Sequence, residues 1–440
     1  MPHLKAYVIE CMFKINFRCS NRPYQTNTCC AMTNFFLYFL RNISFLRKNE
    51  KIEKGVSQQV LSGVAVPTAL GHQTAVRDPA VTAESAPRRS GWMFCFFFFS
   101  IMSVSTSTRA IRRNTLVVAT RRDAASVNIC NSLLIKAGYF ASLGVEGHEA
   151  NLYVCQRRGG GKVILWNQDD SLLGLDDPQD KVSSILGESI DDVIFLSKHT
   201  ASSGRASLTV HPIGVPWLQV GSESEWGGKA GRCSPPHPLI APLFRACVSA
   251  VKERGLKSIF QVSLEATHHG PFVKVPACFV EIGSTEDHWH IPQAGDLWAD
   301  VLVDHLALIH STEREIPAPP PPPPTPPQLS KRNVVLVTCG GGHYCPKLND
   351  FCGLGDRAFS GHCMASYAIE PLLSSSEYQT VLDEVVTSTA QAHQDAEIWL
   401  LVDLKNQEQT LKVCGYMATT SPGVRLFTDF RQVKNTFLDK

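Results

Sequence analysis

Four short segments of this chain carry the side chains that could do chemistry, and the first runs from Glu265 to Pro271 as Glu-Ala-Thr-His-His-Gly-Pro. It follows an apolar run of strand type, and ligand sites gather at the ends of parallel strands. If the alternation of the strand continues, Glu265 and Thr267 share one face while the two histidines point to opposite sides. One of His268 and His269 could then be a metal ligand or a general base. Two loop histidines bonded to the backbone are the alternative.

The second segment, Val337–Tyr344, also ends an apolar strand and contains three consecutive glycines before His-Tyr. Glycine lets the backbone approach a ligand closely and presents its N–H groups to an anion. His343 stands where a catalytic or metal-binding imidazole would follow such a loop. The predicted substrate-binding residues here are Gly340, Gly341, Gly342 and Tyr344.

The third segment, Ser197–Gly204, is a cationic, hydroxyl-rich loop that continues through a short strand to His211. Such a loop suits a phosphate or a carboxylate. We therefore expect Lys198, His199 and Ser202 to bind substrate, with an ordinary polar turn as the alternative.

The fourth segment, Cys278–His290, contains Glu281 on an otherwise apolar strand, where a buried carboxylate needs a partner. His288 and His290 are predicted to lie on the surface. Together the four segments would gather His, Glu, Gly and Thr at one sheet edge, which is typical of a hydrolytic or zinc site.

The elements that must position these residues alternate between strands and helices from Asn114 onward. This pattern predicts an α/β fold, a single domain with a mainly parallel mixed sheet covered by helices on both faces. The predicted helices are Ser126–Ala137, Pro238–Arg254, Ala294–His310 and Tyr378–His393. The predicted strands are Thr115–Thr120, Leu152–Gln156, Val163–Trp166, Asp192–Leu196, Leu208–His211, Ile259–Leu264, Ala277–Ile282, Val334–Thr338 and Ile398–Val402.

Residues 1–101 differ from the rest of the chain, because they carry a charge of +7 while residues 102–440 carry −5. Their apolar runs are shorter than the roughly 20 residues that a membrane helix needs. We expect a non-native or disordered extension, with an organellar transit peptide as the alternative. Met102 would then open the domain, which extends to residue 440.

Nine prolines among the eleven residues 317–327 require an extended polyproline segment. We predict a proline-rich loop insertion at 316–330 within one domain, because residues beyond it would have too few strands for a core of their own. A domain boundary and a proline-motif ligand for a partner are the alternatives.

Composition excludes several classes of protein. The chain has 440 residues, 44% of them apolar, and a net charge of +2, so it is neither disordered throughout nor a histone-like cation. Its 15 cysteines include no Cys-x-x-Cys pair, and scattered thiols are typical of a reducing compartment. A nucleic acid would have to bind through local basic patches, for which we name Arg245, Lys252, Arg254 and Lys257, or Lys331 and Arg332.

The chemical segments resemble the archaeal- and plant-type D-aminoacyl-tRNA deacylases. The resemblance lies in residues 198–211, 265–271, 280–285 and 340–344, in the order of that family, and covers the chain from about Asn114 to the C-terminus. The chain departs from the family pattern at Cys345-Pro346-Lys347, where a small residue would follow the tyrosine.

The resemblance implies hydrolysis of the ester between a D-amino acid and the terminal ribose of tRNA. It also implies a zinc cofactor, a fold related to peptidyl-tRNA hydrolase, and a link to aldehyde-modified aminoacyl groups and ethanol tolerance. The implied location is the cytoplasm, also the nucleus, and the implied partner is D-aminoacyl-tRNA, bound by a monomer without DNA or membrane. As a mechanistic hypothesis, zinc is held by some of His268, His269, His343 and Glu265, with the three histidines as the predicted ligands. The predicted catalytic residues are Glu265, Thr267, His268, His269 and His343.

One other mechanism and two other functions stay open from the residues alone. A histidine could act as general base without metal while backbone amides near Gly341 stabilise the oxyanion. The chain could also be a peptidyl-tRNA hydrolase-like esterase, or a non-catalytic RNA-binding protein of the stress response.

Overall fold

The computed structural model describes residues 113–137, 141–142, 151–222, 224–308 and 332–440. The predictions for residues 1–101 and for the proline-rich insertion at 316–330 lie outside these residues. Among the described helices, none is long and apolar enough to cross a membrane.

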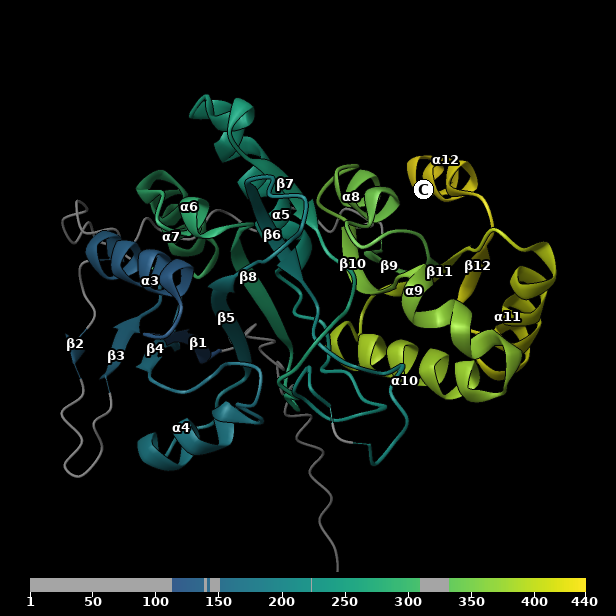
Figure 1. Cartoon of the computed structure of the whole chain (residues 1–440), viewed down its shortest axis with the longest axis horizontal. Coiled ribbons are helices and arrows are strands. Elements are labelled where there is room, and N and C mark those ends of the chain that lie inside the picture. Colours follow the sequence, from purple (N-terminus) through teal and green to yellow (C-terminus); the bar gives the residue numbers. More distant parts are fainter. Residues whose placement is uncertain (1–112, 138–140, 143–150, 223, 309–331) are drawn as a thin grey trace, which may run out of the picture. The chain divides into compact units, whose positions relative to one another are not determined.

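The larger sheet has eight strands in the order β2-β3-β4-β1-β5-β8-β6-β7 (Figure 1). Its middle is parallel, since β1 pairs in parallel with β4 and β5, and β5 with β8. The pairs β2–β3, β3–β4 and β6–β8 are antiparallel. The strands are β1 (Thr115–Thr120), β2 (Ala141–Ser142), β3 (Asn151–Gln156), β4 (Lys162–Gln168), β5 (Asp192–Lys198), β6 (Ser207–His211), β7 (Gln261–Leu264) and β8 (Ala277–Gly283).

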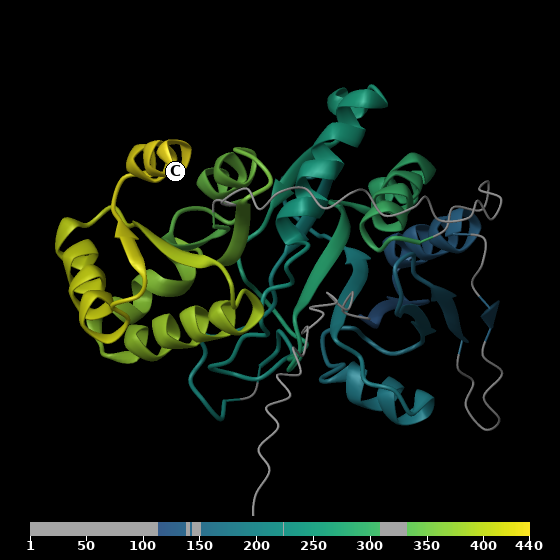
Figure 2. The ribbon, with the colours of Figure 1, turned by 180° about the vertical axis from the view of Figure 1, so that it is seen from behind.

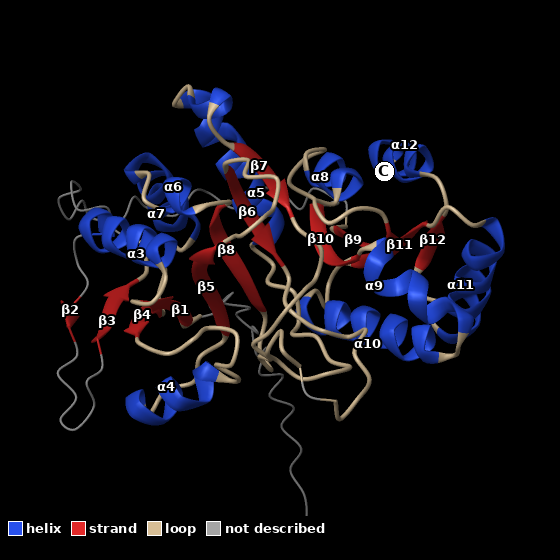
Figure 3. Ribbon diagram, in the orientation of Figure 1, coloured by secondary structure: helices blue, strands red, loops and turns tan. Residues whose placement is uncertain are grey.

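The two faces of this sheet bury alternate side chains of each strand, as a strand repeat of two requires. Val117 and Ala119 of β1 face one apolar cluster, which includes residues of α3 (Ala124–Ala137), α5 (Ile240–Glu253) and α7 (Pro292–His305). Leu116 and Val118 face another, which α4 (Pro178–Leu186) and loop residues cover (Figure 3). The short α6 (Glu286–Trp289) and η1 (Leu256–Ser258) lie in the connections.

The C-terminal part forms a second, fully parallel sheet of four strands, in the order β10-β9-β11-β12. Its strands are β9 (Val334–Gly340), β10 (Ala358–Met364), β11 (Glu397–Asp403) and β12 (Arg425–Phe427). Its helices are α8 (Pro346–Cys352), α9 (Ser366–Ile369), η2 (Glu370–Ser374), α10 (Glu377–Ala392), α11 (Gln407–Thr420) and α12 (Phe430–Asp439). Figure 2 shows these elements from behind.

The prediction of one sheet is therefore wrong, although the α/β class is confirmed. Each predicted strand and helix is present, but β2, β10 and β12 were not predicted. β10 reads Ala-Phe-Ser-Gly-His-Cys-Met and β12 has three residues, so neither forms an apolar run. With these two strands the C-terminal residues have a sheet of their own.

One hydrophobic cluster joins the two sheets. It contains Val117 and Val280 of the larger sheet together with Leu336 and Trp399 of the smaller one. Arg245 of α5 crosses the same boundary, because its guanidinium donates to the backbone carbonyls of Cys352 and Ala358. This residue, which the sequence offered as a tRNA contact, thus stabilises the junction of the sheets.

Candidate active site

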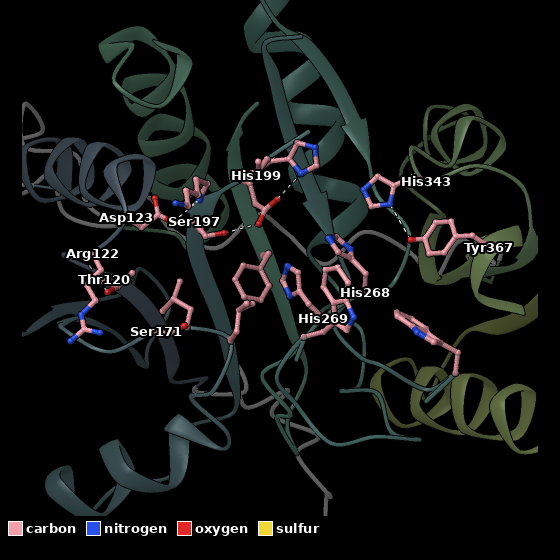
Figure 4. A pocket seen from close by; sticks show the side chains of 18 residues that line it. Thr120, Arg122, Asp123, Ser171, Ser197, His199, His268, His269, His343 and Tyr367 are labelled. Atoms are coloured by element: carbon pink, nitrogen blue, oxygen red, sulfur yellow. Dashed lines mark hydrogen bonds and ion pairs between the residues drawn. The ribbon is translucent and has the colours of Figure 1, made fainter. Parts of the chain in front are cut away.

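A cavity of about 850 Å³ lies at the carboxyl ends of strands from both sheets (Figure 4). Its lining includes polar and basic side chains, aromatic rings, and four histidines with Glu281. The lining residues that the argument uses are Arg122, Lys198, His199, Trp226, His343 and Tyr367.

Glu281 of β8 is a buried carboxylate with a full set of partners. Its Oε1 accepts a hydrogen bond of 2.6 Å from Ser197 Oγ and lies 3.5 Å from His211 Nε2. Its Oε2 accepts from Thr209 Oγ1 at 3.4 Å and lies 3.6 Å from His199 Nδ1. Burial would raise the pKa of Glu281, but the neighbouring histidines outweigh it and hold this pKa well below its usual range. The partner expected for this residue is therefore present.

Three histidines converge beside this carboxylate: His211, His268 and His269. The Nδ1 of each lies within 3.0 Å of a backbone carbonyl, those of Pro212, Ala266 and Gly270 respectively. Such a bond fixes the proton on Nδ1 and leaves Nε2 with its lone pair. One ligand atom from each ring lies within 4.8 Å of the others, so the three imidazoles could hold one metal ion.

The electrostatics of this trio also suit a cation. Burial and the charges of its neighbours hold the pKa of His268 well below its ordinary value, and burial lowers the pKa of His269 to about 4. Both are therefore neutral at pH 7, the form that ligates metals. His211 Nε2 is buried and lies 3.5 Å from Glu281 Oε1. Burial would lower the pKa of His211, but the Glu281 carboxylate outweighs it and raises this pKa. The pair therefore favours a positive charge between Nε2 and the carboxylate, which a proton or a metal ion would supply.

Glu265, at the end of β7, links a second group. It is fully buried, and its Oε1 lies 3.1 Å from His199 Nδ1. Its Oε2 lies 3.0 Å from His343 Nε2 and 3.7 Å from His268 Nε2. On its other side the His343 ring faces the Tyr367 hydroxyl, at 3.1 Å from Nδ1. The group of His199, Glu265 and His343 also lies within metal-binding distance.

The structure thus divides the predicted ligands between two groups. His268 and His269 group with His211, while His343 groups with His199 and Glu265. His199 and Tyr344 were both predicted to bind substrate. His199 lines the cavity, and its Nε2 lies 3.1 Å from the Tyr344 hydroxyl, whereas Tyr344 itself does not line the cavity.

Thr267 is buried and does not line the cavity. Its hydroxyl lies 3.0 Å from His362 Nδ1 and accepts a hydrogen bond of 3.1 Å from the backbone N–H of Cys363. Its own N–H donates to the Cys363 carbonyl at 2.8 Å. Thr267 therefore ties the histidine loop to β10.

The glycine segment lines a small separate pocket rather than the large cavity. Gly340 has a φ of +107°, and a Cβ there would lie 2.2 Å from the Asp403 carbonyl oxygen, so glycine is required for close packing. The N–H of Gly341 donates to Ser366 Oγ at 3.2 Å. This amide is already bonded within the protein, so it is not free to stabilise an oxyanion. Gly342 lines the same small pocket.

Two predicted substrate residues of the third segment lie differently. Lys198 is exposed, lines the cavity and places its Nζ 4.6 Å from the Trp289 ring centroid. Ser202 is exposed and does not line the cavity. In the fourth segment, His288 is half-buried and bonds Thr285, and His290 is exposed.

Sequence reasoning missed several residues of the site. His211 stands at a strand end next to a proline, a position that could have signalled it. Asp123 caps α3 and accepts the N–H of Lys198 at 2.8 Å, and burial raises its pKa. The aromatic residues Trp217, Trp226 and Tyr367 carried no local signal.

One disulfide joins two segments of the site. Cys345, just after His343, is bonded to Cys363 of β10. The sequence had indicated scattered, unpaired thiols, and this pair is the exception. It links the loop of His343 to the strand that holds Thr267.

Comparison with known proteins places the cluster within one family. The profile of the D-aminoacyl-tRNA deacylases matches residues 186–418, which contain both groups of histidines and glutamates. The chain is similar to the D-aminoacyl-tRNA deacylase of Arabidopsis thaliana, with 37% identity over 255 residues, 58% of this chain and 75% of the relative. It is also similar to that of Pyrococcus horikoshii, with 29% identity over 58% of this chain and 81% of the relative.

A solved structure supports the fold. The crystal structure of AF0625, described as a conserved protein of unknown function, has a TM-score of 0.55 and 25% identity to this chain. The match covers 73% of this chain and 97% of that one, so both sheets have counterparts in one known architecture.

Proposed function

This chain belongs to the D-aminoacyl-tRNA deacylase family, and from that membership we propose that it hydrolyses the ester between a D-amino acid and the terminal ribose of tRNA. The products are the free D-amino acid and the tRNA. The observation that carries the proposal is the histidine and glutamate cluster against the cavity, because all of its members lie within the stretch that matches the family. The protein is accordingly an ester hydrolase of translation quality control.

We propose zinc as the metal of this site, with His211, His268 and His269 as its ligands. The fit is supported by the three rings with bonded Nδ1 atoms and by the buried Nε2 of His211, which faces the Glu281 carboxylate. Three histidines are a common set for catalytic zinc. A zinc ion there would supply a Lewis acid that polarises the ester carbonyl and makes water more acidic.

The remaining chemistry falls to His343 and Glu265. Glu265 Oε2 accepts the Nε2–H of His343, which leaves the lone pair on Nδ1. A carboxylate in this position orients an imidazole and stabilises its protonated form. His343 Nδ1 would take a proton from the attacking water, and the protonated ring would then give it to the departing ribose oxygen. Tyr367, whose hydroxyl lies 3.1 Å from Nδ1, would help to hold the water.

The experiment that tests the function compares three substrates: D-tyrosyl-tRNA, L-tyrosyl-tRNA and N-acetyl-D-tyrosyl-tRNA. Preference for the first identifies a D-aminoacyl-tRNA deacylase, and preference for the last a peptidyl-tRNA hydrolase-like esterase. Absence of turnover on all three would leave the non-catalytic RNA-binding alternative. His343→Ala should abolish the hydrolysis, and full activity in that variant would refute the general-base role.

Further parts of the proposal concern the chain as a whole. We propose residues 102–440 as one deacylase domain that acts as a monomer in the cytoplasm, with a fold related to peptidyl-tRNA hydrolase. The cluster shared by the two sheets supports a single domain. D-Aminoacyl-tRNA modified by an aldehyde at its amino group would be a second substrate, and assays with acetaldehyde-treated D-tyrosyl-tRNA test the link to ethanol tolerance.

A further inference from the structure

The mouth of the cavity carries exposed aromatic rings. Large apolar side chains exposed in the described residues include two aromatic ones, Trp226 at 51% exposure and Tyr367 at 55%, and both line the cavity. Trp217 lines the same cavity and is half-buried. Exposed rings beside a cavity are typical of sites that receive a flat ligand.

Trp226 is held on a rigid loop although its side chain is exposed. Its backbone carbonyl accepts a hydrogen bond of 2.8 Å from the N–H of Gly270, directly after the two loop histidines. Gly227 has a φ of +68°, and a Cβ there would lie 1.9 Å from the Leu173 carbonyl oxygen. A Cβ at Gly228 would lie 2.9 Å from Gly270 Cα. The loop is therefore packed closely on the catalytic segment, which fixes the backbone position from which the indole projects.

Tyr367 stands directly beside the catalytic group. Its ring centroid lies 6.2 Å from that of His343, and its hydroxyl lies 3.1 Å from His343 Nδ1. The ester of a substrate at His343 thus leaves the attached nucleoside close to this ring. The nucleoside must extend out through the mouth of the cavity because it is joined to the rest of the tRNA, whereas the amino acid can lie wholly inside the cavity.

We propose that Trp226 and Tyr367 form a stacking platform for the unpaired terminal adenine of the tRNA. Proteins commonly hold single-stranded bases by stacking them on exposed aromatic side chains, since every base has a π-face. The platform positions the ester against the histidine cluster without contacting the amino acid. The proposal rests on the deacylase function and names the part of the substrate that these two rings contact.

The test measures binding of uncharged tRNA ending in CCA and of the same tRNA ending in CC, by the full chain and by Trp226→Leu. The original protein should bind the CCA end roughly 10-fold more tightly, because one stacked base contributes about that much. Trp226→Leu should lose this difference while binding the CC end as before. An equal preference for CCA in both proteins would overturn the proposal.

Kinetics separate stacking of the base from contact with the amino-acid side chain. Trp226→Leu should raise KM by roughly 10-fold for D-tyrosyl-tRNA and D-alanyl-tRNA alike. A larger loss for D-tyrosyl-tRNA than for D-alanyl-tRNA would show instead that the rings contact the acyl group. If the original protein hydrolyses neither tRNA, the deacylase function itself fails, an outcome distinct from failure of the platform.

Tyr367 is tested by a pair of variants, because its hydroxyl and its ring have different roles. Tyr367→Phe should keep the CCA preference, and Tyr367→Leu should lose it. Leu411→Ala is the matched control, because Leu411 is also an exposed apolar side chain, at 64%, and does not line the cavity. Loss of the CCA preference in this control would refute a local effect of the rings.

Discussion

Thr267→Val separates a positioning role of this residue from a chemical one. The sequence offered Thr267 as a catalytic residue, but its hydroxyl bonds the Cys363 N–H and faces His362 Nδ1, and it does not line the cavity. Valine has nearly the shape of threonine, so the change removes the hydroxyl and little else. We expect a loss of stability with little loss of turnover.

The size of the loss follows from the contacts. Both the Cys363 N–H and His362 Nδ1 are buried. Because each unpaired buried polar group costs about 1–3 kcal/mol, the free energy of unfolding should fall by about 2–6 kcal/mol. The catalytic loop should stay in place, because the Thr267 N–H donates to the Cys363 carbonyl and the Ala266 N–H to the His343 carbonyl. We therefore expect kcat/KM within about 10-fold of the original value.

Urea unfolding and deacylation of D-tyrosyl-tRNA measure the two quantities on the same preparations. Thr267→Ser is the matched control, because it keeps the hydroxyl and should restore most of the stability. The reasoning is refuted if Thr267→Val is as stable as the original protein, or if it stays folded and loses turnover that Thr267→Ser restores. The second result would make the hydroxyl a catalytic group.

Three further predictions concern metal, pH and the disulfide. Removal of metal by dialysis against a chelator should abolish deacylation, and added zinc should restore it. His211→Ala should stay folded but bind less zinc, as measured by elemental analysis. Activity that survives complete metal removal would exclude the zinc mechanism. Burial lowers the pKa of His393 from 6.5 to about 4, so the unfolded chain binds this proton at a higher pH than the folded chain does. Stability should therefore be full above pH 6.5 and fall as the pH drops toward 4. His393→Phe should flatten this decline, as measured by thermal unfolding. Cys345 and Cys363 are 18 residues apart, so reduction of their disulfide should lower the free energy of unfolding by about 3 kcal/mol. A Cys345→Ser variant as stable as the original protein under non-reducing conditions would contradict this.

The local elements and the chemical segments could be predicted from the sequence. Apolar runs such as Thr115–Thr120 and Val334–Gly340 form strands because their side chains are buried on both faces of a sheet. The same reasoning placed Glu265 and His343 at strand ends and required a partner for Glu281. These features depend on residues near one another in the chain, so their pattern is visible in a single sequence.

The grouping of the side chains could not be predicted, because it depends on strand order and on pairing between distant segments. The pairing of β6 with β7, together with the loops that follow these strands, brings His211 to His268. The sequence had instead suggested His343 as the third ligand beside His268 and His269. The amide of Gly341 donates to Ser366, which belongs to a helix, α9, that was not predicted from the sequence. Sequence by itself thus determined which residues stand at strand ends. Only the tertiary structure decided which of them meet, since the distance between two strand ends is set by packing across the whole sheet.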